Sequence, residues 1–238
     1  MKYNNYSSTR ETNTYYDQGL RIYMLSIYQN MSMALGISAL VAYIVGSSSQ
    51  IAMMLFSTPL AYVVMFAPLI YIFFFSHKLM DTGRAQAMLH LGIFAALNGL
   101  SLGSIFLVYT TASIAKTFFI TASTFGAMSI YGYSTKKDLT AAGSFAYMGL
   151  IGLVIACLIN LFLRTAALDF AISFIGVGIF TILTAYDTQK LKSIYYAMNG
   201  NTARAGNIAV YGALTLYLDF INLFIMLLHF FGIRKSDD

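Results

Sequence analysis

The sequence predicts an all-α polytopic membrane protein, folded as a single bundle of seven transmembrane helices. Of its 238 residues, 58% are hydrophobic and only 10% are charged, whereas a typical soluble domain has about 25% charged residues. Apolar runs of about 20 residues, the length that spans a bilayer, recur between short polar breaks. The basic residues stand singly or in pairs at these breaks, so the net charge of +5 does not indicate nucleic-acid binding.

Polar breaks and turn residues divide the chain into its expected elements. Residues 1–18 are expected to form a flexible polar cytoplasmic tail, 19–233 the single membrane domain and 234–238 a short polar tail. Residues 51–58 are short and fit an interfacial piece, and Pro68 is expected to kink the second helix. The expected helices are 21–46, 59–77, 85–109, 114–133, 140–163, 167 to beyond Asp187, and 207–231.

Lysine and arginine fall unequally on the two sides of seven crossings. Ten lie on the side of the amino terminus and four on the other side. Because basic loops stay in the cytoplasm, this asymmetry places the amino terminus there. An odd number of crossings puts the carboxyl terminus outside, whereas one re-entrant segment would return it to the cytoplasm.

Two aspartates lie in the last two apolar segments, where a charge is costly. Asp187 lies near the end of the sixth helix, and Asp219 lies in the middle of the seventh with no Lys or Arg within a turn. An ionised carboxylate inside a bilayer is unfavourable unless it finds a partner, a proton or water. Taken alone, Asp187 also fits an interfacial residue paired with Lys190. The midpoint of the two aspartates is position 203, flanked by Asn and Gly, so a hairpin there would bring both carboxyls to similar depth.

Asp187 and Asp219 therefore form a candidate pH-sensing and ion-pathway site. Two adjacent carboxyl groups in a low-dielectric site disfavour double ionisation, so the pair is expected to share a proton. When deprotonated, the same oxygens suit transient binding of a hard cation such as calcium. Thr215 and Asn222 lie on the same helix face as Asp219 and are possible supporting polar groups.

The remaining motifs favour packing over chemistry. The chain has no phosphate-binding loop, no Cys/His metal spacing and no HExxH motif, so we expect no enzymatic activity and no bound cofactor. Cys157 is the only cysteine, which excludes a disulfide within the chain. Ala95, Gly99 and Gly103 recur every four residues and predict close packing of the third helix.

Several segments together resemble the Bax inhibitor-1 family, also called the transmembrane Bax inhibitor motif family. The resemblance covers roughly residues 20 to 231. It is carried by TASTFGAMSIYGYSTKKDL at 121–139, by 149–152, by Asn160, by FTILTAYDTQ at 180–189 and by LYLDFINLF at 216–224.

The resemblance implies a seven-helix bundle with the last helix central and a pH-sensitive calcium leak. It also implies that Asp187 and Asp219 match the two aspartates whose shared proton senses pH. The short tails are similar to those of bacterial inner-membrane members. One departure is that residues 51–76 carry no charge, whereas a bacterial relative uses an acidic and a basic residue in or near the second helix to latch its closed state.

Two functions follow as hypotheses. The first is a proton-gated calcium leak channel, whose partners are the bilayer, calcium ions and protons. The alternative is a non-conducting interaction protein that modulates a membrane-anchored ATP-dependent protease or another membrane complex.

Overall fold

The computed structural model describes residues 4–75, 83–198 and 202–235, and the side chains of 18–74, 83–198 and 206–235. Within these ranges the chain is helical and contains no strand, apart from one isolated bridge between Tyr109 and Arg234. The helices of the described ranges are α1 (Asn4–Ser47), α2 (Ser49–Phe56), α3 (Leu60–Phe75), α4 (Arg84–Leu102), α5 (Ile105–Val108), α6 (Thr111–Ser134), α7 (Thr140–Leu163), α8 (Ala166–Ala197) and α9 (Thr202–Phe231).

Five helical segments of the described chain are long and apolar enough to cross a membrane. Helices α2 and α3 form a sixth candidate when taken together. The break between them contains Pro59, and their axes differ in direction by 81°. The expected class, an all-helical multi-pass membrane protein, is therefore confirmed. The five segments are Gln18–Ser47, Arg84–Val108, Thr140–Leu163, Ala166–Ala197 and Gly206–Phe231.

Helix α6 is as long as α7, with 24 residues each, but it is less apolar. It contains Lys116 and eight serines and threonines. Several of these hydroxyl side chains face the protein, since Thr117 and Thr121 are fully buried. The Thr121 hydroxyl donates to the Thr117 carbonyl at 2.8 Å, which satisfies it inside the helix. Part of the polar surface of α6 is thus buried inside the protein, whereas Lys116 and Ser123 are exposed.

Three expected boundaries differ most from the structure. Helix α1 begins at Asn4 rather than at residue 21, because neither Gly nor Pro interrupts residues 4–18 and a helix propagates easily once started. The expected helix 85–109 breaks at Gly103 into α4 and α5. Position 203, expected in a turn, lies in the first turn of α9, and the expected turn at 199–201 lies outside the described residues.

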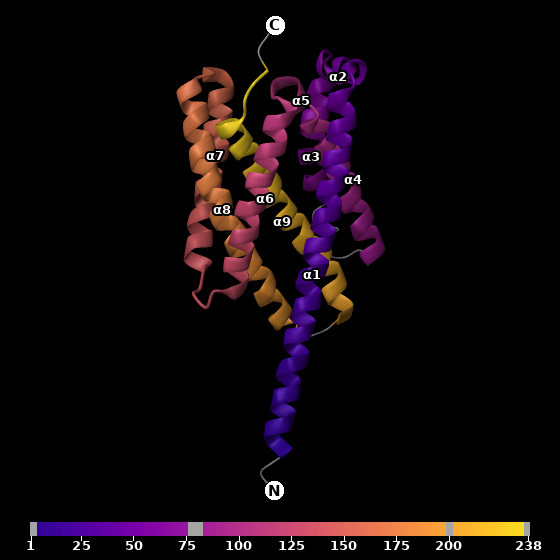
Figure 1. The fold of residues 1–238 in the computed structure, drawn as a ribbon, viewed down its shortest axis with the longest axis vertical. Helices are drawn as coiled ribbons and strands as arrows, with labels where there is room; N and C mark the ends of the chain where they lie inside the picture. Colours follow the sequence, from indigo (N-terminus) through magenta and orange to yellow (C-terminus); the bar gives the residue numbers. More distant parts are fainter. Residues whose placement is uncertain (1–3, 76–82, 199–201, 236–238) are drawn as a thin grey trace.

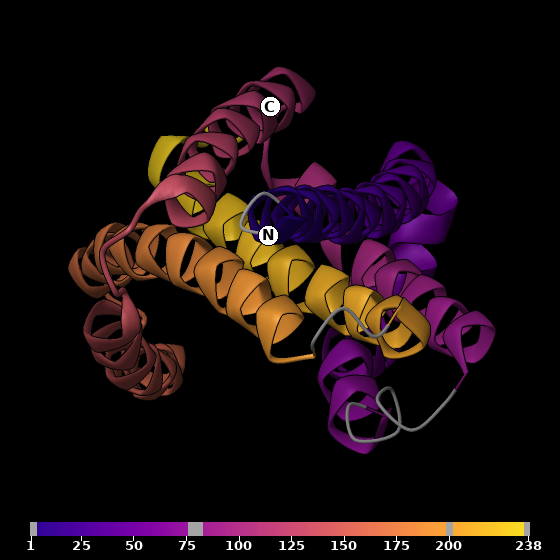
Figure 2. The same cartoon turned by 90° about the horizontal axis from the view of Figure 1, so that it is seen from below.

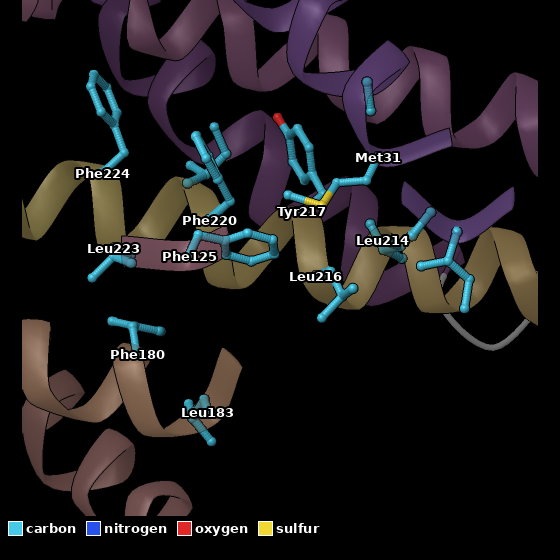
Figure 3. Packing of buried hydrophobic residues seen from close by; sticks show 14 of the residues in the cluster. Met31, Phe125, Phe180, Leu183, Leu214, Leu216, Tyr217, Phe220, Leu223 and Phe224 are labelled. Atoms are coloured by element: carbon cyan, nitrogen blue, oxygen red, sulfur yellow. The ribbon is translucent and has the colours of Figure 1, made fainter. Parts of the chain in front are cut away.

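Helix α9 packs against α8, α1, α6 and α4. More than half of its span is buried, against a third or less of every other candidate span. Figure 2 shows α9 passing between α8 on one side and α1 with α6 on the other. The close-up in Figure 3 shows the reason: Leu216 and Leu223 point towards α8, while Phe220 and Phe224 point to the opposite side.

The predicted small-residue stripe of α4 packs directly on α1. A β carbon on Gly99 would lie 2.7 Å from the Ser38 carbonyl oxygen, and one on Gly103 would lie 2.5 Å from the Val45 side chain. Ala95 on the same stripe is fully buried. The expectation of close helix packing at this stripe is confirmed.

The two termini lie at opposite ends of the bundle (Figure 1). At the carboxyl-terminal end, the segment after α9 pairs with the link between α5 and α6. The Thr110 amide donates to the Ile233 carbonyl at 3.0 Å, and the Lys235 amide donates to the Val108 carbonyl at 2.9 Å. This pairing closes the end of the bundle that is opposite the amino terminus.

Candidate functional site

The candidate site lies where one stripe of α8 faces one stripe of α9. On α8, Leu183 and Asp187 are one turn apart; on α9, Leu216, Asp219 and Leu223 follow the same 3–4 residue spacing. In Figure 3, Leu183 lies below α9 on the side to which Leu216 and Leu223 point. Because each aspartate continues an apolar stripe that is buried between the helices, helix packing alone carries both carboxyls into the interface.

The carboxyl groups of Asp187 and Asp219 are buried and lie within hydrogen-bonding reach of each other. The two side chains are 2% and 6% exposed. Two ionised carboxylates are both acceptors, so a hydrogen bond between them exists only when one carries a proton. Oxygen Oδ2 of Asp219 is buried, and no donor of the described residues reaches it. This oxygen is therefore open to a proton, a cation or a water molecule.

Two groups from neighbouring positions act on Asp187. The Tyr147 hydroxyl of α7 donates to both carboxylate oxygens, at 3.3 and 3.2 Å. Lys190, one turn further along α8, attracts the Asp187 charge, and its ammonium lies 5.8 Å from the centre of the Tyr186 ring. Among the described residues no tyrosine or lysine supports Asp219 in this way, which makes it the more isolated carboxyl of the pair.

The supporting residues expected from the sequence, Thr215 and Asn222, are partly buried on α9. The Thr215 hydroxyl donates to the Tyr211 carbonyl at 3.2 Å, and the Asn222 amide donates to the Leu218 carbonyl at 2.8 Å. In the described part of the chain no hydrogen bond joins either residue to the two aspartates. Their polar groups serve the helix backbone in this conformation.

Sequence reasoning missed Tyr147 and Gln189. Gln189 of α8 accepts from the Leu139 amide at 2.9 Å and donates to the Lys137 carbonyl at 2.8 Å. It thereby fastens the turn between α6 and α7 beside Asp187. A polar amide two residues after a buried aspartate was a visible signal for Gln189. Nothing near Tyr147 in the sequence points to a residue 40 positions away.

Helix α1 also reaches this region. The Tyr28 hydroxyl lies beside Ser129 of α6 and Thr188 of α8, and Thr188 directly follows Asp187. Residues of α1 and α6 thus lie next to the residue that follows Asp187, in addition to the contact that α7 makes through Tyr147.

The charged ligands available to a cation here are the two carboxylates. The described residues contain no group of three or more His, Cys, Asp or Glu side chains that could hold a metal ion. Calcium takes about 6–8 oxygen ligands, so carbonyls and water would have to supply the rest.

The run from Gly99 to Gly103 has the Gly-x-Ser-x-Gly spacing of hydrolase nucleophiles. That motif requires a sharp turn between a strand and a helix. Here the run forms the end of α4, and both glycines pack against α1. Its spacing reflects helix packing.

Comparison with known proteins places the chain in one family. The family model described as "Inhibitor of apoptosis-promoting Bax1" matches residues 20–236. A Rickettsia prowazekii protein is 47% identical over 96% of this chain and 97% of its own length. The inner membrane protein YbhL of Escherichia coli K12 is 43% identical over 91% of this chain and 94% of its own length. A Caulobacter vibrioides protein is 44% identical over 91% of this chain and 90% of its own length.

The family match confirms the resemblance carried by the sequence motifs, and the apolar helices agree with it. The chain is therefore a multi-pass membrane protein that belongs to the Bax inhibitor-1 family.

Proposed function

We propose that this protein is a pH-sensitive calcium leak channel in which Asp187 and Asp219 share the controlling proton. One observation carries the proposal: two carboxyl groups meet, buried, between the two helices α8 and α9. Intramembrane carboxyls of this kind mark proton relays and ion paths more often than packing.

When one carboxyl of the pair carries a proton, a hydrogen bond between the two aspartates joins α8 to α9. When that proton is lost, the two carboxylates repel each other and push the helices apart. Two unit charges 4 Å apart repel by about 4 kcal/mol at an effective dielectric constant of 20. A two-state protein whose packings differ by a few kcal/mol is shifted by such an energy from one state almost fully to the other. Proton loss also uncovers oxygens that attract a hard cation. The same event thus loosens the helices and prepares an ion site.

The proposal includes seven crossings and a central α9, and the helix lengths and contacts support both. The five apolar segments and the α2–α3 pair supply six crossings. With 24 residues, α6 extends about 36 Å, more than the roughly 30 Å of a bilayer core, and supplies the seventh. The opposite positions of the termini in Figure 1 agree with an odd number, and the four neighbours of α9 support its central place.

The proposed location is a bacterial inner membrane with the amino terminus in the cytoplasm. The relative YbhL is named an inner membrane protein. The α6–α7 turn, which contains Lys136 and Lys137, lies at the amino-terminal end of the bundle (Figure 1). Lys192 donates to the Tyr133 carbonyl beside this turn, and Arg21 lines the same hollow as Ser134. A basic end of this kind stays in the cytoplasm.

Calcium flux into proteoliposomes across a pH series tests this proposal. Wild type should show a pH-dependent leak, and Asp219→Asn and Asp187→Asn should each remove most of that dependence, since an amide cannot exchange the proton. Asp169→Asn is the matched control, because Asp169 lies on α8 at the opposite end and is bound by the Asn160 amide. A calcium flux whose pH dependence is unchanged in both Asp187→Asn and Asp219→Asn would contradict the proposal.

The interaction hypothesis remains the second candidate, favoured by the first turns of α1. These turns extend beyond the other helices at the amino-terminal end (Figure 1). If purified protein carries no calcium while deletion of residues 1–17 abolishes protection of membrane-protease substrates in cells, this second function replaces the first.

A further inference from the structure

Helices α1 and α6 both pack on α9 but make at most marginal contact with each other. In Figure 1, α9 lies behind and between them. Side chains do not fill the space between these two helices. Two hollows of about 700 and 340 Å³ follow one another along it, and both are lined by Leu35, Phe118 and Phe220. We call this continuous feature the α1–α6 groove.

The larger hollow has the length and chemistry of a site for one acyl chain. It extends from Arg21 to Leu35 on α1, a rise of about 21 Å, whereas one leaflet of a bilayer core is about 15 Å thick. Met31 on α1 and Ala122 on α6 contribute apolar walls. A β carbon on Gly126 would meet no atom within 4 Å, which shows that the groove is open at that residue.

The mouth of the groove is polar and positively charged. Arg21 is exposed there, and Tyr133 and Ser134 line the same end. An arginine fork binds phosphate oxygens well, and hydroxyl groups can bind the rest of a headgroup. An apolar groove that ends at a cation and hydroxyls matches a phospholipid with its phosphate at the mouth.

We propose that the α1–α6 groove binds one anionic phospholipid, with its headgroup at Arg21 and one acyl chain lying over Phe220 between α1 and α6. The inference goes beyond the calcium leak and does not depend on it. The occupant comes from the surrounding bilayer, and the negative headgroup is selected by Arg21 over a zwitterionic one.

Lipid-specific quenching of a single tryptophan tests the proposal. The sequence contains no tryptophan, so Phe118→Trp places a unique reporter in the groove. Phe145→Trp places a comparison reporter on α7, where Phe145 is 70% exposed. Brominated phosphatidylglycerol should bind about fivefold more strongly than brominated phosphatidylcholine at the groove reporter, the factor expected for one basic side chain near an anionic lipid. At the α7 reporter the two lipids should quench alike.

Substitutions then assign the preference to the groove. Arg21→Gln should remove the preference and Arg21→Lys should keep most of it, while Lys136→Gln at the same end should change nothing. Gly126→Leu should reduce quenching by both lipids, because it fills the groove. Gly152→Leu on α7 is its control, since a β carbon there also meets nothing within 4 Å.

Two outcomes would overturn the proposal. A phosphatidylglycerol preference of equal size at both reporters would show general attraction to a basic protein. This comparison is made with Arg21 in place, so it does not depend on whether an Arg21 variant folds. A preference that survives Arg21→Gln in folded protein would place the headgroup elsewhere.

Discussion

Gly132 of α6 packs directly against the backbone carbonyl of Ala185 on α8, and no room remains between them for a β carbon. Ala185 is two residues from Asp187, so this contact fixes the depth at which α6 meets the helix of the carboxyl pair. A backbone carbonyl cannot move aside as a side-chain tip can.

We therefore expect Gly132→Ala to destabilise the protein by about 1–3 kcal/mol, the usual cost of overpacking. Gly126→Ala on the same helix meets open space and should be neutral or stabilising by up to about 1 kcal/mol, through helix propensity alone. Thermal unfolding in one detergent measures both variants. Equal melting temperatures for the two would show that the α6–α8 contact is looser than described.

Gln189 holds the α6–α7 turn through two backbone hydrogen bonds, to the Leu139 amide and the Lys137 carbonyl. Gln189→Ala should cost about 1–3 kcal/mol, since each bond contributes about 0.5–1.5 kcal/mol. Gln189→Glu keeps the acceptor and loses the donor, so its effect should fall between those of wild type and alanine. Hydrogen exchange at the Leu139 amide distinguishes the two variants. Gln189→Ala should make this exchange much faster, whereas Gln189→Glu should make it only slightly faster. Fast exchange in both variants would contradict the assigned roles.

The carboxyl pair was predictable because a charge in an apolar run is a local signal. The geometric reason given for their meeting was wrong, however. Helix α8 ends at Ala197 and α9 begins at Thr202, so the turn is not centred on 203 and the two arms differ in length. The aspartates meet because each continues a buried stripe of its helix, with Leu183 on α8 and Leu216 on α9.

Other parts of the site required tertiary structure. Tyr147 reaches Asp187 only because α7 packs on α8, and no spacing within α7 encodes that. The polar segment before residue 19 carried no helix signal of its own, and it joins α1 because the apolar span that follows it nucleates the helix. The packing stripe of α4 was predictable, since small residues four apart define one helix face without reference to a partner.

Asp138 precedes α7 and accepts hydrogen bonds from the Thr140 amide at 2.9 Å and the Thr140 hydroxyl at 2.6 Å. These bonds favour the ionised form and hold the pKa of Asp138 below its usual value. Because the pKa of Asp138 is lower in the folded state, the two hydrogen bonds stabilise the folded state fully at pH values above the unfolded pKa of about 3.9. It is lost as the pH falls through the folded value.

Asp138→Ala should therefore speed hydrogen exchange at the Thr140 amide at neutral pH, and the difference from wild type should vanish once the wild-type carboxyl is protonated at strongly acidic pH. Lys136→Ala in the same turn is the control and should leave that exchange unchanged. A difference between Asp138→Ala and wild type that stays constant over the whole pH range would show that the carboxylate charge is not involved.

Ser38 joins three helices through one hydroxyl. It donates to the Ala95 carbonyl of α4 at 2.7 Å, so the Tyr217 hydroxyl of α9, 2.7 Å away, acts as the donor to Ser38. Tyr217 is fully buried. Ser38→Ala leaves the buried Tyr217 hydroxyl without a hydrogen-bond partner and should cost about 1–3 kcal/mol of folding free energy. Tyr217→Phe removes that hydroxyl, so no buried polar group is left unpaired on Tyr217, and it should cost about 0.5–1.5 kcal/mol.

The double variant should be little worse than Ser38→Ala alone, because the orphaned hydroxyl is then gone, and a double-mutant cycle by thermal unfolding measures this coupling. Ser123→Ala is the matched control: its exposed hydroxyl donates to the Phe119 carbonyl of its own helix, so the change should stay within about 0.5 kcal/mol. Strict additivity of Ser38→Ala and Tyr217→Phe would mean that the two hydroxyls do not bond, and that α9 is held against α1 and α4 by apolar packing alone.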